Sequence, residues 1–239
     1  MVLPYANIHE NRIQLHNIRD CVYRSEDDYD VRHFNRQVFL DDVQTVDFIM
    51  VPFKDAPALA HTMLSFGLRD GQHLVFSAEA RLEQDEDYAA VAGATKQYEL
   101  IYVVGTEEDL IKLRTDVRIV DVYLYPLNID VSTTQRLFLA AVARVNQIAR
   151  TPEFYQLLSN NCTTNIVDLV NQVHPHAIAE DLRILLPGQS DRLVYDQGWM
   201  AATGPFEEVR LASRINIKAQ LYDGQGNFSR AIRSHSELQ

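Results

Sequence analysis

The sequence predicts an α+β fold, in which a meander of antiparallel strands is followed by packed helices. Two alternating apolar runs flank Asp70-Gly71, a dipeptide typical of a hairpin turn. Other runs rich in β-branched and aromatic residues lie on both sides of this hairpin. Long stretches with helical spacing of apolar residues begin after residue 131. Strands that precede helices, instead of alternating with them, are typical of this class.

The strand elements are expected in chain order. The first sixty residues contain polar breaks and short apolar runs, and "VDFIMVPF" (46–53) has the composition of a buried strand. Pro57 marks a loop before the hairpin, whose first strand His61 would open and whose second strand Glu79 and Arg81 would close. A strand at 96–106, a short helix at 107–117 and a strand at 121–129 are predicted next.

Two longer helices are expected in the second half. Ser132, with Gln135 three residues later, predicts a capping box at the start of the first helix. A second helix should begin near Cys162, because apolar residues recur at helical spacing up to Val173. The chain after Asn216 is polar and has no clear pattern, so we expect one domain over 1–239 with a polar extension at about 216–239.

Composition narrows the class of protein. The chain has 239 residues, 46% of them hydrophobic and 23% charged, which is typical of a globular domain. Its net charge of −11 argues against nucleic acid as a partner and against tight binding to anionic headgroups. No run approaches the roughly 20 apolar residues that span a bilayer, and the start lacks the pattern of a signal peptide.

Metal and cofactor sites are not expected. Cys21 and Cys162 fit two free thiols as well as they fit a disulfide. No cysteine and histidine pattern has zinc spacing, and His174 and His176 flank Pro175, which breaks helical ligand geometry.

Cys162 is the candidate nucleophile. Its neighbours are asparagines and threonines, and it lies at the expected start of a helix, where backbone N–H groups and the helix dipole favour a thiolate. The same N–H groups and an asparagine side chain are suited to receive an oxyanion. The alternative is a buried cysteine that acts as a small hydrophobic residue.

His61 is the candidate base among eight histidines. It would project from the start of a strand towards a helix end, whereas His73, just past the turn, is expected to be exposed. The alternative for His61 is a structural, hydrogen-bonded histidine. The base in turn needs a third group that orients its ring. If Arg69-Asp70-Gly71 forms the turn, paired residue numbers sum to 140 and His61 lies opposite Glu79.

A two-residue turn would instead give pairs that sum to 141, and Glu79 would then point to the other face. The alternative for Glu79 itself is an exposed carboxylate paired with Arg81.

The order of several motifs resembles the periplasmic domain of the Lnb family, bacterial lipoprotein N-acyltransferases. The resemblance covers about 15–200 and is carried by "AHTMLSFGLRDGQHLVFSAEARLEQ", "YELIYVVGTEEDLIKLRT", "VYLYPL", "PEFYQLLSNNCTTNI" and "LLPGQSDRLVYDQG". That family is similar to permuted papain-like enzymes such as lecithin–retinol acyltransferase and NlpC-type peptidases. The implied fold is an antiparallel sheet packed against helices, with the nucleophile at a helix N-terminus.

The resemblance also implies roles for individual residues. Cys162 would be the nucleophile, His61 the base and Glu79 the third member. Residues expected to line the site or bind an oxyanion are Asn161, Tyr155, Asn160 and Thr163, with His73 and Arg81 as secondary candidates. Arg81, Glu83 and Arg114 fall on family motifs, where a structural ion-pair role is equally expected.

The expected function is therefore that of an extracytoplasmic, periplasmic thiol acyltransferase or hydrolase without a cofactor. Its substrate would be a lipid, lipoprotein or peptide, with the membrane approached through a segment outside this chain. The alternatives are a cysteine peptidase or amidase acting on peptidoglycan or peptide, and a non-catalytic binding module on the same fold. An apolar groove would favour a lipid donor, and a polar groove would favour a peptide.

Overall fold

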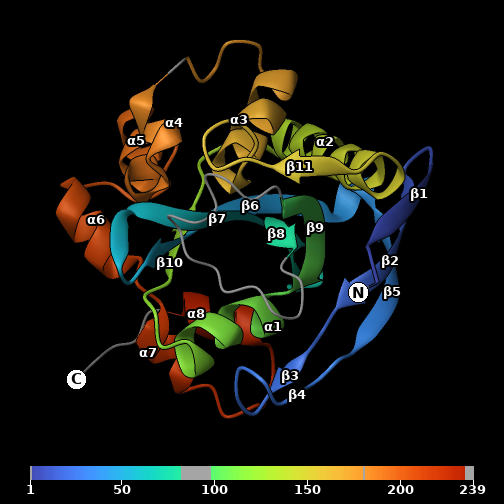
Figure 1. Ribbon diagram of the computed structural model, residues 1–239, viewed down its shortest axis with the longest axis horizontal. Helices are drawn as coiled ribbons and strands as arrows, with labels where there is room; N and C mark the ends of the chain where they lie inside the picture. Colours follow the sequence, from blue (N-terminus) through green and yellow to red (C-terminus); the bar gives the residue numbers. More distant parts are fainter. Residues whose placement is uncertain (1, 82–97, 180, 235–239) are drawn as a thin grey trace.

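A computed structural model describes residues 2–81, 98–179 and 181–234, and within them it confirms the α+β class (Figure 1). Nine of the described strands form one sheet in the order β1-β2-β9-β8-β7-β6-β10, with β5 paired to β2 and β11 paired to β9. The strands of this sheet are β1 (Tyr5–His9), β2 (Arg12–Arg19), β5 (His33–Phe39), β6 (Val43–Phe53), β7 (Ala56–Leu68), β8 (His73–Arg81), β9 (Tyr98–Thr106), β10 (Tyr123–Pro126) and β11 (Glu153–Tyr155). A separate ribbon pairs β3 (Val22–Tyr23) with β4 (Tyr29–Asp30).

The sheet is mixed and not purely antiparallel as expected. Its neighbouring strands are antiparallel except for β2 and β9, which pair in parallel at Arg19 and Gly105. β1, β2 and β5, where the sequence showed only short apolar runs, belong to this sheet. Ile13 and Leu15 of β2 are buried because strand residues alternate between faces, and Ile18 is also buried because the register shifts between Leu15 and Ile18.

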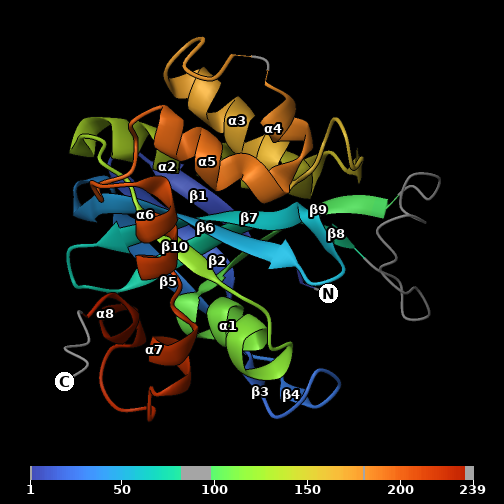
Figure 2. The same cartoon turned by 90° about the vertical axis from the view of Figure 1, so that its left-hand side faces the viewer.

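Helices cover both faces of the sheet (Figures 1 and 2). α2 (Val131–Arg150), α3 (Cys162–Val173), α4 (Leu182–Leu185) and α5 (Ser190–Asp196) lie on one face, and α1 (Glu107–Lys112), α7 (Asn216–Gln220) and α8 (Phe228–Arg233) lie on the other. α6 (Phe206–Ala212) lies at the side of the sheet near β10.

Each face has its own apolar core. Under α2, the rings of Phe66, Phe76 and Phe138 pack edge to face, with centroids 5.3–5.6 Å apart. On the opposite face, Phe228 and Ile232 of α8 are buried against the sheet. The C-terminal segment that gave no clear pattern thus forms two helices, which are too short for a helical period to be visible in the sequence.

The central hairpin has the register in which paired residue numbers sum to 140. Gly67 pairs with His73 and Met63 pairs with Ser77. The Leu68 N–H donates to the Gln72 carbonyl at 2.9 Å, which closes the turn of Arg69-Asp70-Gly71. Gly71 has a φ of +82°, a conformation that suits glycine. The alternative register, with a sum of 141, is wrong.

Two helices differ in detail from the prediction. α2 is capped by Asp130, whose carboxylate accepts from the Thr133 N–H at 2.9 Å, so the prediction of Ser132 as the cap is wrong. Asp130 fills the role because it precedes the first helical turn in an extended conformation. The predicted helix at 107–117 is α-helical only to Lys112 and continues as a π-helical turn, Leu113–Val117.

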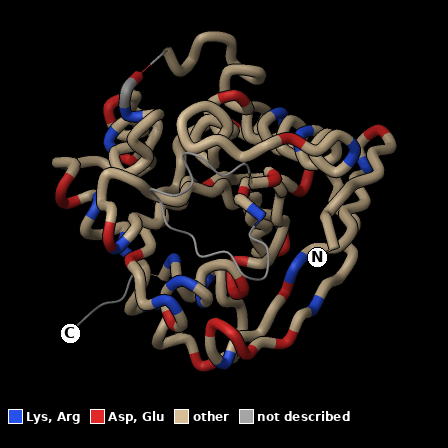
Figure 3. The backbone as a smooth tube through the Cα atoms, in the orientation of Figure 1, with Lys and Arg blue, Asp and Glu red and all other residues tan. Residues whose placement is uncertain are grey.

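Charged residues are distributed along the chain, with acidic and basic positions interspersed (Figure 3). Arg19 of β2 makes two bonds of 2.9 Å to the buried carboxylate of Asp109 in α1, and these bonds connect the sheet to this helix.

Across the described residues, every helix falls short of the length and apolar content that crossing a bilayer requires.

Candidate active site

Cys162 is the first residue of α3. Asn161 caps this helix by accepting from the Thr164 N–H at 2.8 Å, and the Thr164 hydroxyl accepts in return from the Asn161 N–H at 2.8 Å. This reciprocal capping box begins the helix at the cysteine. The Cys162 side chain therefore lies at the positive end of a twelve-residue helix.

The thiol is enclosed by short polar contacts. The Tyr155 hydroxyl lies 4.0 Å from the Cys162 Sγ atom, and the Sγ atom lies 3.7 Å from the Ala60 carbonyl oxygen. The hydroxyls of Thr163 and Thr62 are 3.0 Å apart. These contacts dock the start of α3 onto β7 on either side of His61, leaving 3% of Cys162 exposed.

His61 lies where two strands part. β7 and β8 are paired only as far as Met63 and Ser77, whereas β8 remains paired to β9 up to Arg81. In this opening the His61 Nε2 atom lies 2.7 Å from the Ser77 Oγ atom, and 3.7 Å from the Glu79 Oε1 atom.

Ser77 connects the histidine to the glutamate. The Ser77 hydroxyl donates to Glu79 Oε1 at 2.9 Å, and both side chains project from the same face of β8 because they are two residues apart. Glu79 is therefore near His61, but its principal connection to the ring passes through a serine. Ser77 was not among the residues that the sequence indicated.

Glu79 is held as a carboxylate. Burial by itself raises its pKa, but the charge of Arg114, followed by those of Arg19 and His61, lowers the pKa to about 2. The Arg114 Nη2 atom lies 3.4 Å from Glu79 Oε1. Arg81 instead pairs with Glu99 at 2.8 Å, so the alternative that paired Glu79 with Arg81 is wrong. Glu83 lies outside the described residues.

The thiol of Cys162 is acidic for a buried cysteine. Burial raises its pKa, but hydrogen bonding from His61 and the charge of that ring outweigh the burial and lower the pKa to about 6. Cys21 behaves in the opposite way, because burial raises the pKa of its thiol. Both cysteines are free, so the disulfide alternative is wrong.

The two asparagines before the cysteine have structural contacts. Asn161 donates from its amide to the Leu157 carbonyl at 2.6 Å, in addition to capping α3. Asn160 donates to the Phe154 carbonyl at 3.0 Å and to Glu153 at 3.1 Å. These bonds hold the loop that leads into the helix.

An apolar cavity of about 320 Å³ is lined in part by Thr163, the residue after Cys162. Its lining residues come mainly from α3, α2, α5 and the strands β6 and β7. Most of its wall is aliphatic or aromatic, including Phe48, Leu64, Leu137, Ile166, Val170 and Trp199. The lining was not predictable in advance, because it comes from segments far apart in the sequence.

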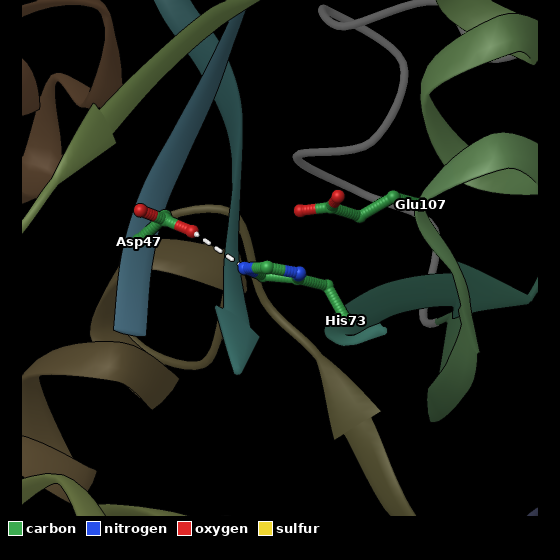
Figure 4. A group of neighbouring side chains, drawn as sticks. All are labelled: Asp47, His73 and Glu107. Carbon is green, nitrogen blue, oxygen red and sulfur yellow. Dashed lines mark ion pairs between the residues drawn. The ribbon is translucent and has the colours of Figure 1, made fainter. Parts of the chain in front are cut away.

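His73 belongs to a different cluster. It was expected to be exposed, but only 11% of its side chain is accessible, because it lies beside Asp47 of β6 and Glu107 of α1 (Figure 4). One potential ligand atom from each of these residues lies within 4.8 Å of the others. Gly67 makes room for the ring, since a Cβ atom there would lie 2.7 Å from His73 Nε2.

The cation that this cluster holds is an arginine. The Arg233 Nη2 atom lies 2.5 Å from Asp47 Oδ2 and 2.5 Å from Glu107 Oε1. A guanidinium thus bridges the two carboxylates that a metal ion would need. His73 lies at the turn end of β8, away from the Glu79 end, and the structure does not bring it to Cys162.

The fold and the site together define an α+β domain with a cysteine at a helix N-terminus facing a histidine on the sheet. The family model described as the Lnb N-terminal periplasmic domain matches residues 29–188, and the chain belongs to this family of periplasmic domains. Comparisons with curated proteins and with solved structures found no match.

Proposed function

We propose that this domain is a thiol acyltransferase or hydrolase in which Cys162 is the nucleophile and His61 is the base. The observation that carries the proposal is the chain of hydrogen bonds from His61 through Ser77 to Glu79, next to a thiol whose Sγ atom lies 3.7 Å from the carbonyl oxygen of Ala60, the residue before His61. An activated nucleophile, a base and an orienting group are the parts that covalent catalysis requires.

The hydrogen bonds support one tautomer of the base. An ionised Glu79 can only accept, so the single hydroxyl hydrogen of Ser77 is used towards Glu79. Ser77 must then accept from the Nε2–H group of His61. The neutral ring consequently carries its free lone pair on Nδ1, the nitrogen that would take the proton from the Cys162 thiol.

The reaction follows from these positions. The Cys162 Sγ–H bond breaks, its proton passes to His61 Nδ1, and the thiolate forms a bond to the carbonyl carbon of an ester or amide. The tetrahedral oxyanion would be met by the backbone N–H groups at the start of α3, with the Tyr155 hydroxyl nearby.

Collapse of the tetrahedral intermediate breaks the carbon–oxygen bond of the ester or the carbon–nitrogen bond of the amide, and the His61 imidazolium gives its proton to the leaving group. The resulting thioester is then attacked by an amine or by water. His61 takes the proton of this second nucleophile and returns it to the departing sulfur, which restores the thiol.

The cavity favours an acyl donor with a hydrocarbon chain. Thr163, the residue after the nucleophile, contributes to the cavity wall, and the aliphatic lining would remove a chain from water. A lipid or lipoprotein substrate at the periplasmic face of a membrane is therefore preferred to a peptide. The resemblance of the motifs also implies a permuted papain-like arrangement, in which a histidine strand precedes a cysteine helix, and this mechanism would suit such an arrangement.

A non-catalytic binding module is the second candidate, and the low exposure of Cys162 is the observation that favours it. A substrate carbonyl can reach Sγ only if the contact with Tyr155 or with Ala60 opens. The apolar cavity alone would then bind a lipid chain without reaction.

Mass spectrometry tests the proposal directly. The protein is incubated with phospholipid vesicles or with a muropeptide, and peptide mapping then locates any acyl group. An adduct from phospholipid on Cys162, retained in Cys21→Ser and lost in both Cys162→Ala and His61→Ala, is expected. An adduct from the muropeptide would indicate an amidase. No adduct from either substrate, together with equal slow alkylation of both thiols, would favour the binding module.

A further inference from the structure

The π-helical turn after α1 carries a buried arginine. Residues Leu113–Val117 leave the α-helical pattern, and Arg114 within them is 5% exposed. Such turns are rare and occur frequently at functional sites. Here the Nη2 atom of Arg114 lies 3.4 Å from the Oε1 atom of Glu79.

The contacts of Arg114 fit a positioning role. Its Nη1 atom donates to the Leu110 carbonyl at 2.7 Å, which fixes the guanidinium, and its Nη2 atom lies 3.4 Å from Glu79. Within the described part of the chain, Glu79 is the carboxylate that pairs with it. Burial lowers the pKa of Arg114, and the negative charge of Glu79 raises it. Each charge therefore offsets part of the free-energy cost of burying the other.

The neighbouring Arg19 makes its hydrogen bonds elsewhere. Its guanidinium makes two bonds to Asp109, and its charge also acts on Glu79, less strongly than that of Arg114. Arg114 is therefore the principal cation of Glu79 and the one that pairs with it, at 3.4 Å.

The turn itself is held from the C-terminal part of the chain, beyond the region that matches the family. Gln220 of α7 donates to the carbonyl of Thr115, the residue after Arg114, at 2.8 Å. Arg233 of α8 binds Glu107, the first residue of α1. The helix and the π-turn are consequently braced at both ends by α7 and α8 (Figure 2).

We propose that Arg114 is a positioning residue of the proposed catalytic site, which keeps Glu79 ionised and directed at Ser77 so that His61 keeps its Nε2–H tautomer. This inference rests on the proposed function. It extends the Cys162–His61–Ser77–Glu79 chain by a buried cation on a π-helical turn and makes the C-terminal helices a support of the site.

The rate of Cys162 alkylation by iodoacetamide, measured against pH, tests the inference without a substrate. In Arg114→Met, Glu79 loses its principal cation, and burial then favours the protonated form of Glu79. At acidic pH the His61 imidazolium would lose the nearby negative charge of Glu79. The midpoint of the acid limb is expected to rise by about one pH unit or more. Arg114→Lys keeps the charge and should restore most of the wild-type profile. Arg81→Met, on the same strand as Glu79 but paired with Glu99, is the matched control and should not move it.

A double-mutant cycle shows whether Arg114 acts through Glu79. In a Glu79→Gln background, Arg114→Met should cause no further shift. If Arg114→Met does not fold, as judged by circular dichroism, Arg114→Gln keeps a donor without the charge and should give the same upward shift. A wild-type profile in a folded, uncharged Arg114 variant would overturn the inference. A wild-type protein whose Cys162 alkylates no faster than Cys21 would instead contradict the proposed function.

Discussion

The Nε2 atom of His61 lies 2.7 Å from the hydroxyl oxygen of Ser77, and this serine connects the ring to the carboxylate of Glu79. The arrangement differs from a direct histidine–carboxylate pair, because a single hydroxyl hydrogen sets the direction of both bonds. The identity of residue 77 should therefore matter to the reactivity of Cys162, because Ser77 contacts His61, the residue proposed as the base for this thiol.

Ser77→Ala removes this bridge and should slow alkylation of Cys162 at pH 6 by roughly tenfold or more, the value of one hydrogen bond to a charged group. Stopped-flow measurement with a fluorescent iodoacetamide would give the rate. Ser65→Ala is a matched control, since Ser65 is also buried and donates to a different glutamate, Glu107, at 2.5 Å. Equal rates in the two folded variants would contradict the bridging role.

The reactivity of the two cysteines should separate with pH. Because the pKa of Cys162 is lowered to about 6, its thiolate is present above that pH and is lost as the pH falls through it. The pKa of Cys21 is raised, so it should react only in alkaline solution. Isotope-coded alkylation followed by peptide mapping would report both sites in one sample.

His61→Gln should abolish the reactivity of Cys162 at pH 6, because burial then acts on the thiol without the opposing ring. His73→Gln changes a histidine on the same hairpin that does not contact Cys162, and it should leave the Cys162 profile unchanged. Loss of reactivity in both variants would mean that the effect is a general loss of structure.

Arg233→Met should destabilise the fold by about 3–5 kcal/mol, because it leaves two buried carboxylates without their cation. Arg230→Met, an exposed residue of the same helix, should change the free energy of unfolding by no more than about 0.5 kcal/mol. Urea unfolding followed by circular dichroism would measure both. Indistinguishable midpoints for the two variants would show that the ion pairs of Arg233 with Asp47 and Glu107 contribute nothing to stability.

Filling the cavity should impair long acyl chains selectively. Val170→Phe places a ring in the cavity wall and leaves less room for the acyl chain. Each methylene of the chain that the ring keeps out of the cavity should lose about 0.8 kcal/mol of binding free energy, or roughly fourfold in rate. Hydrolysis of p-nitrophenyl decanoate should fall, while that of p-nitrophenyl acetate and the alkylation of Cys162 remain unchanged. Leu158→Phe, at a site that is 65% exposed, is the control. A parallel loss with both esters would argue against the cavity as the chain site.

Much of the fold was predictable from local patterns. The alternation around Asp70-Gly71 predicted the hairpin, and helical spacing predicted α2 and the start of α3 at Cys162. The elements that were missed are short. α7 and α8 have five and six residues, and their burial depends on Phe228 and Ile232 meeting the sheet rather than on any period.

The sequence by itself determined the hairpin, the two long helices and a cysteine at a helix start, since turn chemistry, capping and periodicity act over a few residues. Tertiary structure alone decided that Ser77 lies between His61 and Glu79, that Arg114 rather than Arg81 pairs with Glu79, and that His73 is buried with Arg233. Each of these depends on strand register and on contacts between segments tens of residues apart, where a shift by one position moves a side chain to the opposite face.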